Sequence, residues 1–505
     1  MSVQRQAIKN VTAMWIGLLI NAAVGFFLSP FILHRLGDEA FSVWILVFAV
    51  TGYFALLDFG IRSAIVKYTA KFTAQQDTEQ LSRHLSTSLV FYMAVALFVL
   101  LATAAGTLYL HLLFMVPAGL IRPARILFLI SGISVACAFP LSVFAGVLEG
   151  LQKFSWLQLT QIGVTLLRGI LIVLALTFGG GLLTIGIITV ALTLLSYFIF
   201  LGMALRVLSV QIRWAHVDKS TLCEMAAYGV FAFVILAAEK LRFQSDAIVI
   251  GAFLSASAIT LFSVGAKLVE YSSYAVRSMS QIITPISSEF HAAGDMDRLR
   301  RTFLAGNRAC AFITFPLCVT LAILGKPIIA AWVGPRYLSC YFVLLVLILP
   351  RSLYLAQSAS IRILLGMGQH RVLASVLLLE GAGNLLLSLL LVKPLGILGV
   401  ALGTSIPLIC TSVLFLPRHL CRVLDMPVRR FLSRAYFLPL ILCVPMAAAL
   451  WIVRAPFPIH TIGGLALQIS VGGAVYGIGL ALVLFTKRPP RLRPWQAFAQ
   501  LLEPK

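Results

Sequence analysis

Charged residues are scarce in this chain, and acidic residues are the scarcer kind. Only 11% of the 505 residues are charged, and 17 Asp and Glu stand against 39 Lys and Arg. A soluble domain carries about 25% charged residues. Because 60% of the residues are hydrophobic and the mean hydropathy is +1.01, this chain has too little charge for a water-facing surface. We therefore predict a protein that crosses a membrane many times.

Several other features are missing, and each absence excludes a class of function. The eight Cys include no C-x-x-C pair and fall mostly inside apolar runs, so we predict neither disulfides nor a metal site. No G-x-x-x-x-G-K-[ST] motif is present to bind the phosphates of ATP. No polar stretch is long enough for a catalytic domain outside the bilayer. We therefore expect no enzyme, no catalytic residues and no cofactor.

Long apolar runs are what the chain does have. A run of about 20 apolar residues spans a bilayer as a helix. Strands of a membrane barrel are half as long and alternate in polarity, which these runs do not. The sequence therefore predicts an all-α membrane protein with 14 transmembrane helices. They lie near residues 11–33, 41–65, 87–113, 126–149, 154–178, 182–205, 225–251, 257–287, 303–325, 338–360, 372–393, 396–417, 435–453 and 461–486.

The net charge of +22 follows from orientation rather than from nucleic-acid binding. If the N-terminus is cytoplasmic, most Lys and Arg fall in cytoplasmic segments, which is the bias that orients membrane proteins. An even number of spans then places both termini in the cytoplasm. Anionic lipid headgroups are the ordinary partners of such bases. No nucleic-acid-binding fold remains outside the membrane, so we expect no nucleic acid as a partner.

The sequence repeats weakly at one offset. "AKFTAQQDTEQL" (70–81) matches "SEFHAAGDMDRL" (288–299), and "LGDEAFSVW" (36–44) matches "LSASAITLF" (254–262) at the same spacing. This pattern predicts a six-helix lobe in residues 1–221, a related lobe in 222–430, and two added helices with a basic cytoplasmic tail in 431–505. Each lobe has an even number of helices, so the repeats are parallel. Transporters use this symmetry, with substrate bound between the halves.

Three segments carry a family resemblance: "LGDEAFSVWILVFAVTGYFALLDFGIRSAIVKYTA" (36–70), "SDAIVIGAFLSASAITLFSVGAKL" (245–268) and "ILGKPIIAAWVGPRYLSC" (323–340). They resemble polysaccharide-unit (O-antigen type) flippases of the multidrug/oligosaccharidyl-lipid/polysaccharide exporter superfamily. The resemblance implies a MATE-like fold with a cavity lined by helices 1, 2, 7 and 8. It also implies a transporter for polysaccharide biosynthesis in a bacterial cytoplasmic (inner) membrane. The implied substrate is undecaprenyl-diphosphate-linked oligosaccharide, flipped to the outer leaflet by alternating access.

Alternative functions stay open at this point. A cation-coupled multidrug exporter and a lipid II flippase belong to the same superfamily. Lipid II flippases carry arginines in their first helix, whereas the polar residue deep in the first run here is Asn21. For the favoured flippase, the expected partners are the lipid-linked oligosaccharide, membrane lipids, H⁺ or Na⁺ as a coupling ion, and a polysaccharide polymerase complex.

Charges inside the apolar runs are the candidate functional groups, because a charge at the centre of a membrane helix costs roughly 2.5–3.5 kcal/mol. Asp58 and Arg62 are four residues apart, so they share a helix face and can neutralise each other. In the functional interpretation, Arg62 binds the lipid diphosphate, since a guanidinium suits phosphate. We expect Glu149 to pair with Lys153 at a helix end, and Arg168 to make a polar contact within its lobe.

The runs at 225–251 and 257–287 hold most of the remaining charge. They are either an internal salt-bridge network or the polar wall of a water-filled cavity. In the second case bases would bind diphosphate, tyrosines would pack on sugars, and acids would couple transport to H⁺ or Na⁺. The predicted substrate-binding residues are Arg62, Arg242, Lys267, Tyr271, Tyr274 and Arg277, and the predicted coupling residues are Glu239, Asp246 and Glu270.

Overall fold

The computed structural model describes residues 3–208, 213, 216–454 and 462–486. These residues are helical almost throughout and include no strand. Eleven of the described helices are long and apolar enough to span a membrane, and a bent pair, Cys340–Ala356 with Ser358–Gly366, makes a twelfth. The prediction of an all-α membrane protein is confirmed. The predicted basic tail beyond residue 486 lies outside the described residues.

Two local features make this arrangement compatible with fourteen spans. The helix His370–Ile409 reverses direction at Gly396. The φ of this residue is 57°, a value that glycine adopts without steric cost. Beyond the reversal, Gly399 packs against Leu391 and Gly403 against Ser388, so this segment is an antiparallel pair of helices, as predicted. The predicted span at 257–287 forms the helices Ala256–Ser280 and Ile283–Ala292, which are not among the eleven that qualify as spans.

The chain divides into two compact units, residues 1–260 and 261–505. The boundary predicted at residue 221 rests on the internal repeat and stays a prediction.

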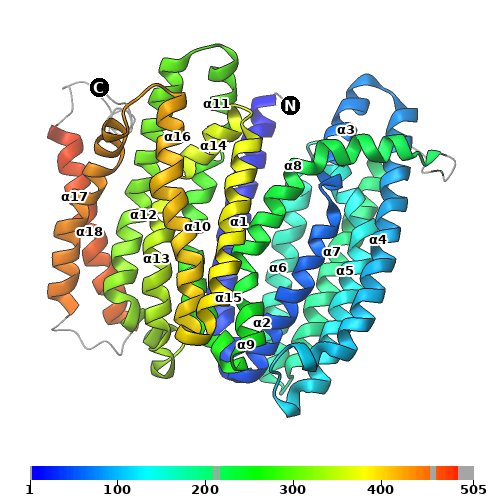
Figure 1. Ribbon diagram of the computed structural model, residues 1–505, viewed down its shortest axis with the longest axis horizontal. Coiled ribbons are helices and arrows are strands. Elements are labelled where there is room, and N and C mark those ends of the chain that lie inside the picture. Colours follow the sequence, from blue (N-terminus) through cyan, green and yellow to red (C-terminus); the bar gives the residue numbers. More distant parts are fainter. Residues whose placement is uncertain (1–2, 209–212, 214–215, 455–461, 487–505) are drawn as a thin grey trace. The chain divides into compact units, whose positions relative to one another are not determined.

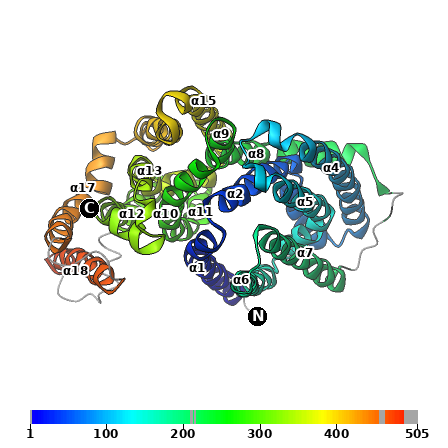
Figure 2. The same ribbon diagram turned by 90° about the horizontal axis from the view of Figure 1, so that it is seen from below.

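Unit 1 is organised around the helix α5, which contacts α2, α3, α4 and α7, while α1 packs along α6 (Figures 1 and 2). Its elements are α1 (Val3–Leu36), α2 (Asp38–Gly52), η1 (Tyr53–Asp58), α3 (Ile61–Gln75), α4 (Thr78–Leu113), η2 (Ala118–Leu120), α5 (Ile121–Gly150), α6 (Phe154–Thr177), α7 (Leu182–Val207), α8 (Lys219–Phe243), α9 (Ser245–Phe253) and the first residues of α10 (Ala256–Ser280).

Unit 2 is organised around α12, which contacts α13, α14 and α17, and α17 in turn packs along α18 (Figure 1). Its elements after α10 are α11 (Ile283–Ala292), α12 (Met296–Trp332), η4 (Pro335–Tyr337), α13 (Cys340–Ala356), α14 (Ser358–Gly366), α15 (His370–Ile409), the π-helix η5 (Cys410–Phe415), α16 (Leu416–Val423), α17 (Val428–Arg454) and α18 (Ile462–Thr486).

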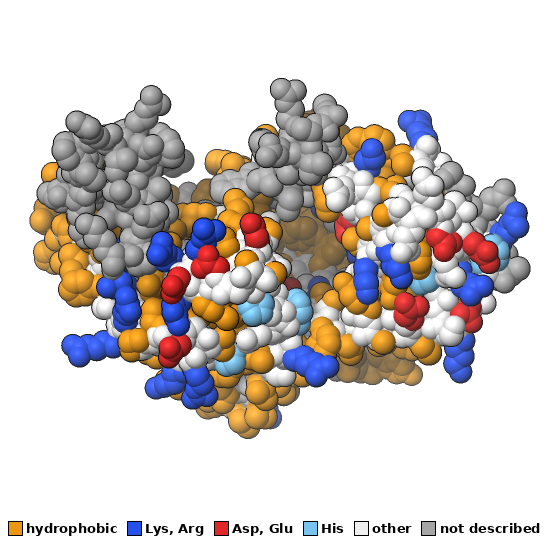
Figure 3. Space-filling view, turned by 90° about the horizontal axis from the view of Figure 1, so that it is seen from above, with side chains coloured by type: hydrophobic (Ala, Val, Ile, Leu, Met, Phe, Trp, Pro, Cys, Tyr) orange, Lys and Arg blue, Asp and Glu red, His pale blue; other side chains and the backbone are white. Residues whose placement is uncertain are grey.

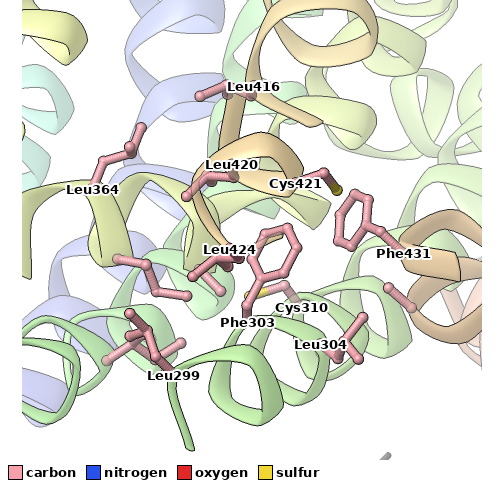
Figure 4. Close-up of a cluster of buried hydrophobic side chains, with 14 of the residues drawn as sticks. Leu299, Phe303, Leu304, Cys310, Leu364, Leu416, Leu420, Cys421, Leu424 and Phe431 are labelled. Carbon is pink, nitrogen blue, oxygen red and sulfur yellow. The ribbon is translucent and has the colours of Figure 1, made fainter. Parts of the chain in front are cut away.

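A buried apolar cluster fixes the ends of α12, α16 and α17 in unit 2 (Figure 4). The rings of Phe303 and Phe431 stack at its centre with centroids 4.5 Å apart. Leu299, Leu420 and Leu424 are almost completely buried around them. Burying such side chains contributes roughly 1.5–3 kcal/mol each, so this end of unit 2 is well fixed.

The two matched sequence segments form the same local structure. In unit 1, α3 ends before Gln76 (φ 56°), and Asp77 caps α4 by accepting a hydrogen bond from the Gln80 amide at 2.9 Å. In unit 2, α11 ends before Gly294 (φ 71°), and Asp295 caps α12 by accepting a hydrogen bond from the Arg298 amide at 3.0 Å. A carboxylate is favoured at this position because it satisfies a free amide of the first turn.

Candidate functional site

A cavity of about 370 Å³ lies inside unit 1. Four segments of the chain surround it: α2 with η1 and α3, α5, α7 and α8. Eight of its fourteen lining residues have hydroxyl or charged side chains, in a chain that is otherwise strongly apolar. The lining residues are Thr51, Gly52, Ala55, Asp58, Arg62, Ser134, Val135, Ala138, Phe139, Ser142, Thr193, Tyr197, Leu236 and Lys240.

An irregular stretch between α2 and α3 shapes this cavity. The α-helix gives way to the 3₁₀-helix η1, and then Phe59 and Gly60 take left-handed backbone conformations (φ 50° and 76°). Phe59 tolerates this conformation while its ring packs on Phe91 and Phe233. Irregular backbone within a membrane protein is tolerated where it is buried or lines a cavity. The break therefore places Asp58 and Arg62 on the wall of the cavity.

Hydrogen bonds hold the carboxylate of Asp58 in place. The hydroxyl of Tyr92 on α4 donates to its carboxylate, and so does the backbone amide of Arg62, at 3.4 Å. Tyr92 itself is completely buried, and its ring packs on Phe139 of α5. A buried hydroxyl needs a partner, so this contact ties α4 to η1.

The guanidinium of Arg62 pairs with Glu149 on α5 at 2.6 Å. The prediction that Arg62 pairs with Asp58 is therefore wrong for the guanidinium. The left-handed residues between them break the regular helix that would align positions four apart. The prediction that Glu149 pairs with Lys153 is wrong too, because Lys153 instead lies over the ring of Trp156.

Lys240 and Arg168 add positive charge near this cavity. Lys240 lines it and donates to Gln244 at 3.0 Å, at the point where α8 ends. Arg168 of α6 donates to Thr193, another lining residue, at 3.2 Å. The contact of Arg168 within its lobe agrees with the sequence-based expectation. The group thus contains three bases and two acids, counting Glu149, and keeps one net positive charge.

The helix α8 is interrupted close to the predicted site residues Glu239, Arg242 and Asp246. It ends at Phe243, and α9 begins at Ser245 after Gln244. Arg242 and Asp246 on either side of this break are buried, with 3% and 7% of their surfaces exposed, whereas Glu239 is exposed. The guanidinium of Arg242 lies 4.8 Å from the ring centre of Phe243. Lys240, rather than Arg242, lines the cavity of unit 1.

In unit 2, five predicted residues form a stripe along one face of α10: Lys267, Glu270, Tyr271, Tyr274 and Arg277. The opposite face is packed, since Gly265 lies against the backbone of α13 and Ser273 accepts a hydrogen bond from Arg351. On the stripe, Tyr274 donates to Glu270 at 3.3 Å.

Aromatic rings and two bases extend this face. Tyr271 lies 6.2 Å from the rings of both Tyr274 and Trp332. Lys267 and Arg277 are half-buried on the same helix. The face therefore combines an acid, bases and neighbouring aromatic rings, which suits a ligand with sugar and phosphate groups.

Sequence reasoning missed Tyr92, Tyr197 and Lys240 as part of one site, because they come from three different helices and lack a shared spacing. Among the described residues, no group of three or more His, Cys, Asp or Glu side chains gathers to hold a metal.

Comparison with known proteins identifies the family. Residues 32–342 match the family described as polysaccharide biosynthesis protein, which is more than half of the chain. The chain belongs to this family. The chain is also similar in sequence to the uncharacterized membrane protein EpsK of Bacillus subtilis (strain 168). The two are 23% identical over 426 residues, which cover 82% of this chain and 83% of that protein.

Solved structures of other proteins have the same fold as this chain. A structure of the lipid II flippase MurJ in an inward closed conformation has a TM-score of 0.73 and 18% identity, covering 93% of this chain and 98% of that one. A multidrug resistance MATE family transporter of the MOP superfamily, facing inward, has a TM-score of 0.70 and 14% identity, covering 83% and 99%. The expected MATE-like fold is confirmed, and the family match confirms the resemblance to proteins of polysaccharide biosynthesis.

Proposed function

We propose that this polysaccharide biosynthesis family member is a flippase for undecaprenyl-diphosphate-linked oligosaccharide. It moves the headgroup from the cytoplasmic to the outer leaflet by alternating access, while the lipid tail stays in the bilayer. One observation carries the proposal: a member of this family holds a hydroxyl-lined, net positive cavity within a bundle of apolar helices. A diphosphate needs bases, and sugars need hydroxyl partners and rings.

The residues have different roles in this proposal. Arg62 is a diphosphate ligand that exchanges its partner Glu149 for the substrate. Lys267 and Arg277 supply further positive charge from α10, and Tyr271 and Tyr274 pack on the sugar. Arg242 is largely buried in this conformation, so its contact with a diphosphate requires rearrangement at the break after α8.

Coupling to H⁺ or Na⁺ is assigned to Glu239, Asp246 and Glu270. Glu239 and Glu270 are exposed, and Glu270 shares a hydrogen bond with Tyr274 that protonation would alter. Asp246 lies in the first turn of α9, where a carboxylate is stabilised by the helix dipole.

The protein acts in a bacterial cytoplasmic membrane with both termini inside. In each unit taken by itself, Lys and Arg side chains lie among Asp and Glu side chains on the surface drawn in Figure 3. Bases at the cytoplasmic ends of spans are the usual arrangement. The polymerase that consumes the exported unit is a proposed partner on the opposite side.

A flipping assay tests the proposal. Full-length protein is placed in liposomes with a fluorescent undecaprenyl-diphosphate oligosaccharide, and a membrane-impermeant quencher added outside reports the transferred fraction. We expect wild type to transfer the lipid and Arg277→Gln to do so about ten- to a hundredfold more slowly, since a charge-assisted contact contributes roughly 1.5–3 kcal/mol. Arg206→Gln, which removes an exposed base from the last turn of α7, is the matched control and should behave as wild type.

The competing function is a cation-coupled multidrug exporter. Folded wild type that transfers no lipid, with or without an ion gradient, but takes up small organic cations would establish that function instead. Equal losses in Arg277→Gln and Arg206→Gln would remove α10 from substrate recognition.

A further inference from the structure

A second cavity, of about 400 Å³, lies in unit 2 and has no part in the proposed transport path. It opens where the turn between α16 and α17 meets the start of α12. Four guanidinium groups and two carboxylates line it, which leaves two net positive charges. They belong to Arg300, Arg301, Arg430, Arg434, Asp297 and Asp425.

The two carboxylates are already engaged by one arginine. Arg300 donates to Asp297 at 3.0 Å, and another of its nitrogens lies 3.7 Å from Asp425. Its Nε donates to the carbonyl oxygen of Leu424 at 2.6 Å. Arg300 therefore connects α12 to the turn between α16 and α17.

The other three arginines keep their guanidinium groups open to the cavity. Arg301, Arg430 and Arg434 form no ion pair or side-chain hydrogen bond with another described residue. Arg430 and Arg434 are four residues apart on α17, so they share one face. Like charges around one cavity repel one another, and an anion between them would relieve this repulsion.

The helix α17 adds to this excess of positive charge. Its first turn contains no acidic residue but includes Arg430. Helix N-termini carry a partial positive charge and favour anions, so an arginine there is unfavourable by itself. A bound anion would satisfy both the helix end and the guanidinium groups.

The cavity is also well fixed. Leu304 and Met426 line it and belong to the apolar cluster of Figure 4, in which Phe303 stacks on Phe431. Arg308 of α12 donates to the backbone carbonyl of Arg434 at 2.6 Å, which joins α12 and α17 directly. The guanidinium groups are thus held on a rigid base, and a fixed site loses little entropy on binding.

We propose that this cavity binds a phosphate group, carried either by an anionic phospholipid headgroup or by a soluble phosphate anion. Guanidinium groups bind phosphate oxygens in pairs, and two net positive charges match a phosphate mono- or dianion. Binding pulls α12 and α17 together by neutralising the repulsion among Arg301, Arg430 and Arg434. The site is independent of the proposed transport activity.

Two experimental arms separate the sources of the phosphate. In the first, full-length protein is placed in nanodiscs of phosphatidylcholine with or without phosphatidylglycerol, and the midpoint of thermal unfolding is measured. In the second, protein in phosphatidylcholine nanodiscs is titrated with inorganic phosphate. A rise in the midpoint in either arm supports the site and identifies the carrier; no rise in either arm overturns it.

Variants of opposite sign decide whether this cavity is responsible. Arg430→Gln should weaken the response about tenfold in concentration, the effect of losing one charge-assisted contact. Asp425→Asn should strengthen it, because it removes a negative charge from a side chain that is 99% exposed and leaves a residue that tolerates the local φ of 47°.

The matched control is Arg429→Gln, which removes an exposed base from the neighbouring residue, outside the cavity lining. It should respond as wild type does. If Arg429→Gln and Arg430→Gln lose the same part of the thermal response, phosphate is attracted by the overall positive charge of this surface and not by the cavity. That result would overturn the proposal.

Discussion

In the unit 1 cavity, the sequence pattern predicted which residues are unusual but not which residues they contact. The unusual charges at Asp58 and Arg62 were recognisable because they interrupt an apolar run. Their partners were not, because Tyr92 and Glu149 come from helices far along the chain. A spacing of four residues predicts a contact only while the helix is regular, and the left-handed backbone at Phe59 and Gly60 ends that regularity.

The Tyr92 hydroxyl provides a direct test of the Asp58 contact. Tyr92→Phe keeps the buried ring and its packing on Phe139, but removes the donor to the carboxylate. We expect the free energy of unfolding to fall by about 1–3 kcal/mol, since the carboxylate loses a hydrogen bond in a partly buried place. Denaturant unfolding in detergent measures this loss. Tyr109→Phe, which changes a 57% exposed tyrosine on the same helix, should have no effect.

The pair of Arg62 and Glu149 is best tested by a double-mutant cycle. The side chains are 38% and 27% exposed, so solvent weakens their attraction, and we expect a coupling energy of about 1 kcal/mol. The stabilities of Arg62→Gln, Glu149→Gln and the double variant give this energy. A coupling near zero would show that the two side chains are not paired in the membrane-embedded protein.

At the scale of helices, the sequence predicted most spans but not their interruptions. The reversal at Gly396 falls between two predicted runs, because Pro394 and Gly396 mark it in the sequence. The break of α8 at Gln244 was not foreseen, since no Gly or Pro occurs there. It depends on tertiary contacts: the carbonyl of Lys240 accepts from Tyr53, and the Gln244 side chain lies directly against Gly52.

The contact of α3 with α8 depends on two glycines. Gly60 and Gly229 bring the backbones together, and a Cβ on Gly229 would lie 2.6 Å from the carbonyl carbon of Gly60. Small residues allow such close packing of membrane helices. Gly229→Ala should therefore push α8 away from α3. The matched control is Gly163→Ala on α6, where a Cβ meets no atom within 4 Å.

Chemical cross-linking measures that separation. The hydroxyl of Tyr68 on α3 donates to Glu224 on α8 at 2.8 Å. A short bifunctional maleimide can therefore bridge cysteines at these two positions, in a protein whose eight native cysteines are replaced. We expect Tyr68→Cys with Glu224→Cys to cross-link readily, and much less so when Gly229→Ala is added. Unchanged cross-linking would mean that the helices absorb the extra methyl group without separating.

The cap that starts α8 lies close to this contact. The side chain of Asp218 accepts hydrogen bonds from Ser220 and Thr221, first from their hydroxyls, and these bonds hold the pKa of its carboxyl well below the usual range. Asp218 therefore stays ionised at any pH at which a cell grows. It caps α8 under all these conditions, so a pH-dependent change in the α3–α8 contact would have to originate elsewhere.

For the whole molecule, composition alone predicted the fold class, whereas the sites required the structure. Scarce charge and long apolar runs predict a helical membrane protein whatever the exact residues are. Such a segment is stable in the bilayer, and there a helix satisfies its backbone hydrogen bonds. The cavities depend on which helices pack together, and weak spacing patterns do not encode that. The basic cavity of unit 2 illustrates this: Arg301 and Arg434 are distant in sequence, and only the packing of α12 on α17 makes them neighbours.

Orientation is the property of the whole chain that sequence predicts and labelling can decide. The excess of bases predicts that the start of α12 is cytoplasmic and that the start of α5 is outside. Arg298 and Arg122 are exposed at these two places, so single cysteines there, in a protein whose eight native cysteines are replaced, report each side. A membrane-impermeant maleimide should label Arg122→Cys in intact cells, and Arg298→Cys only in inside-out vesicles. The reverse pattern would place the basic cavity of unit 2 outside the cell, away from the cytoplasmic leaflet, and would also reverse the proposed direction of flipping.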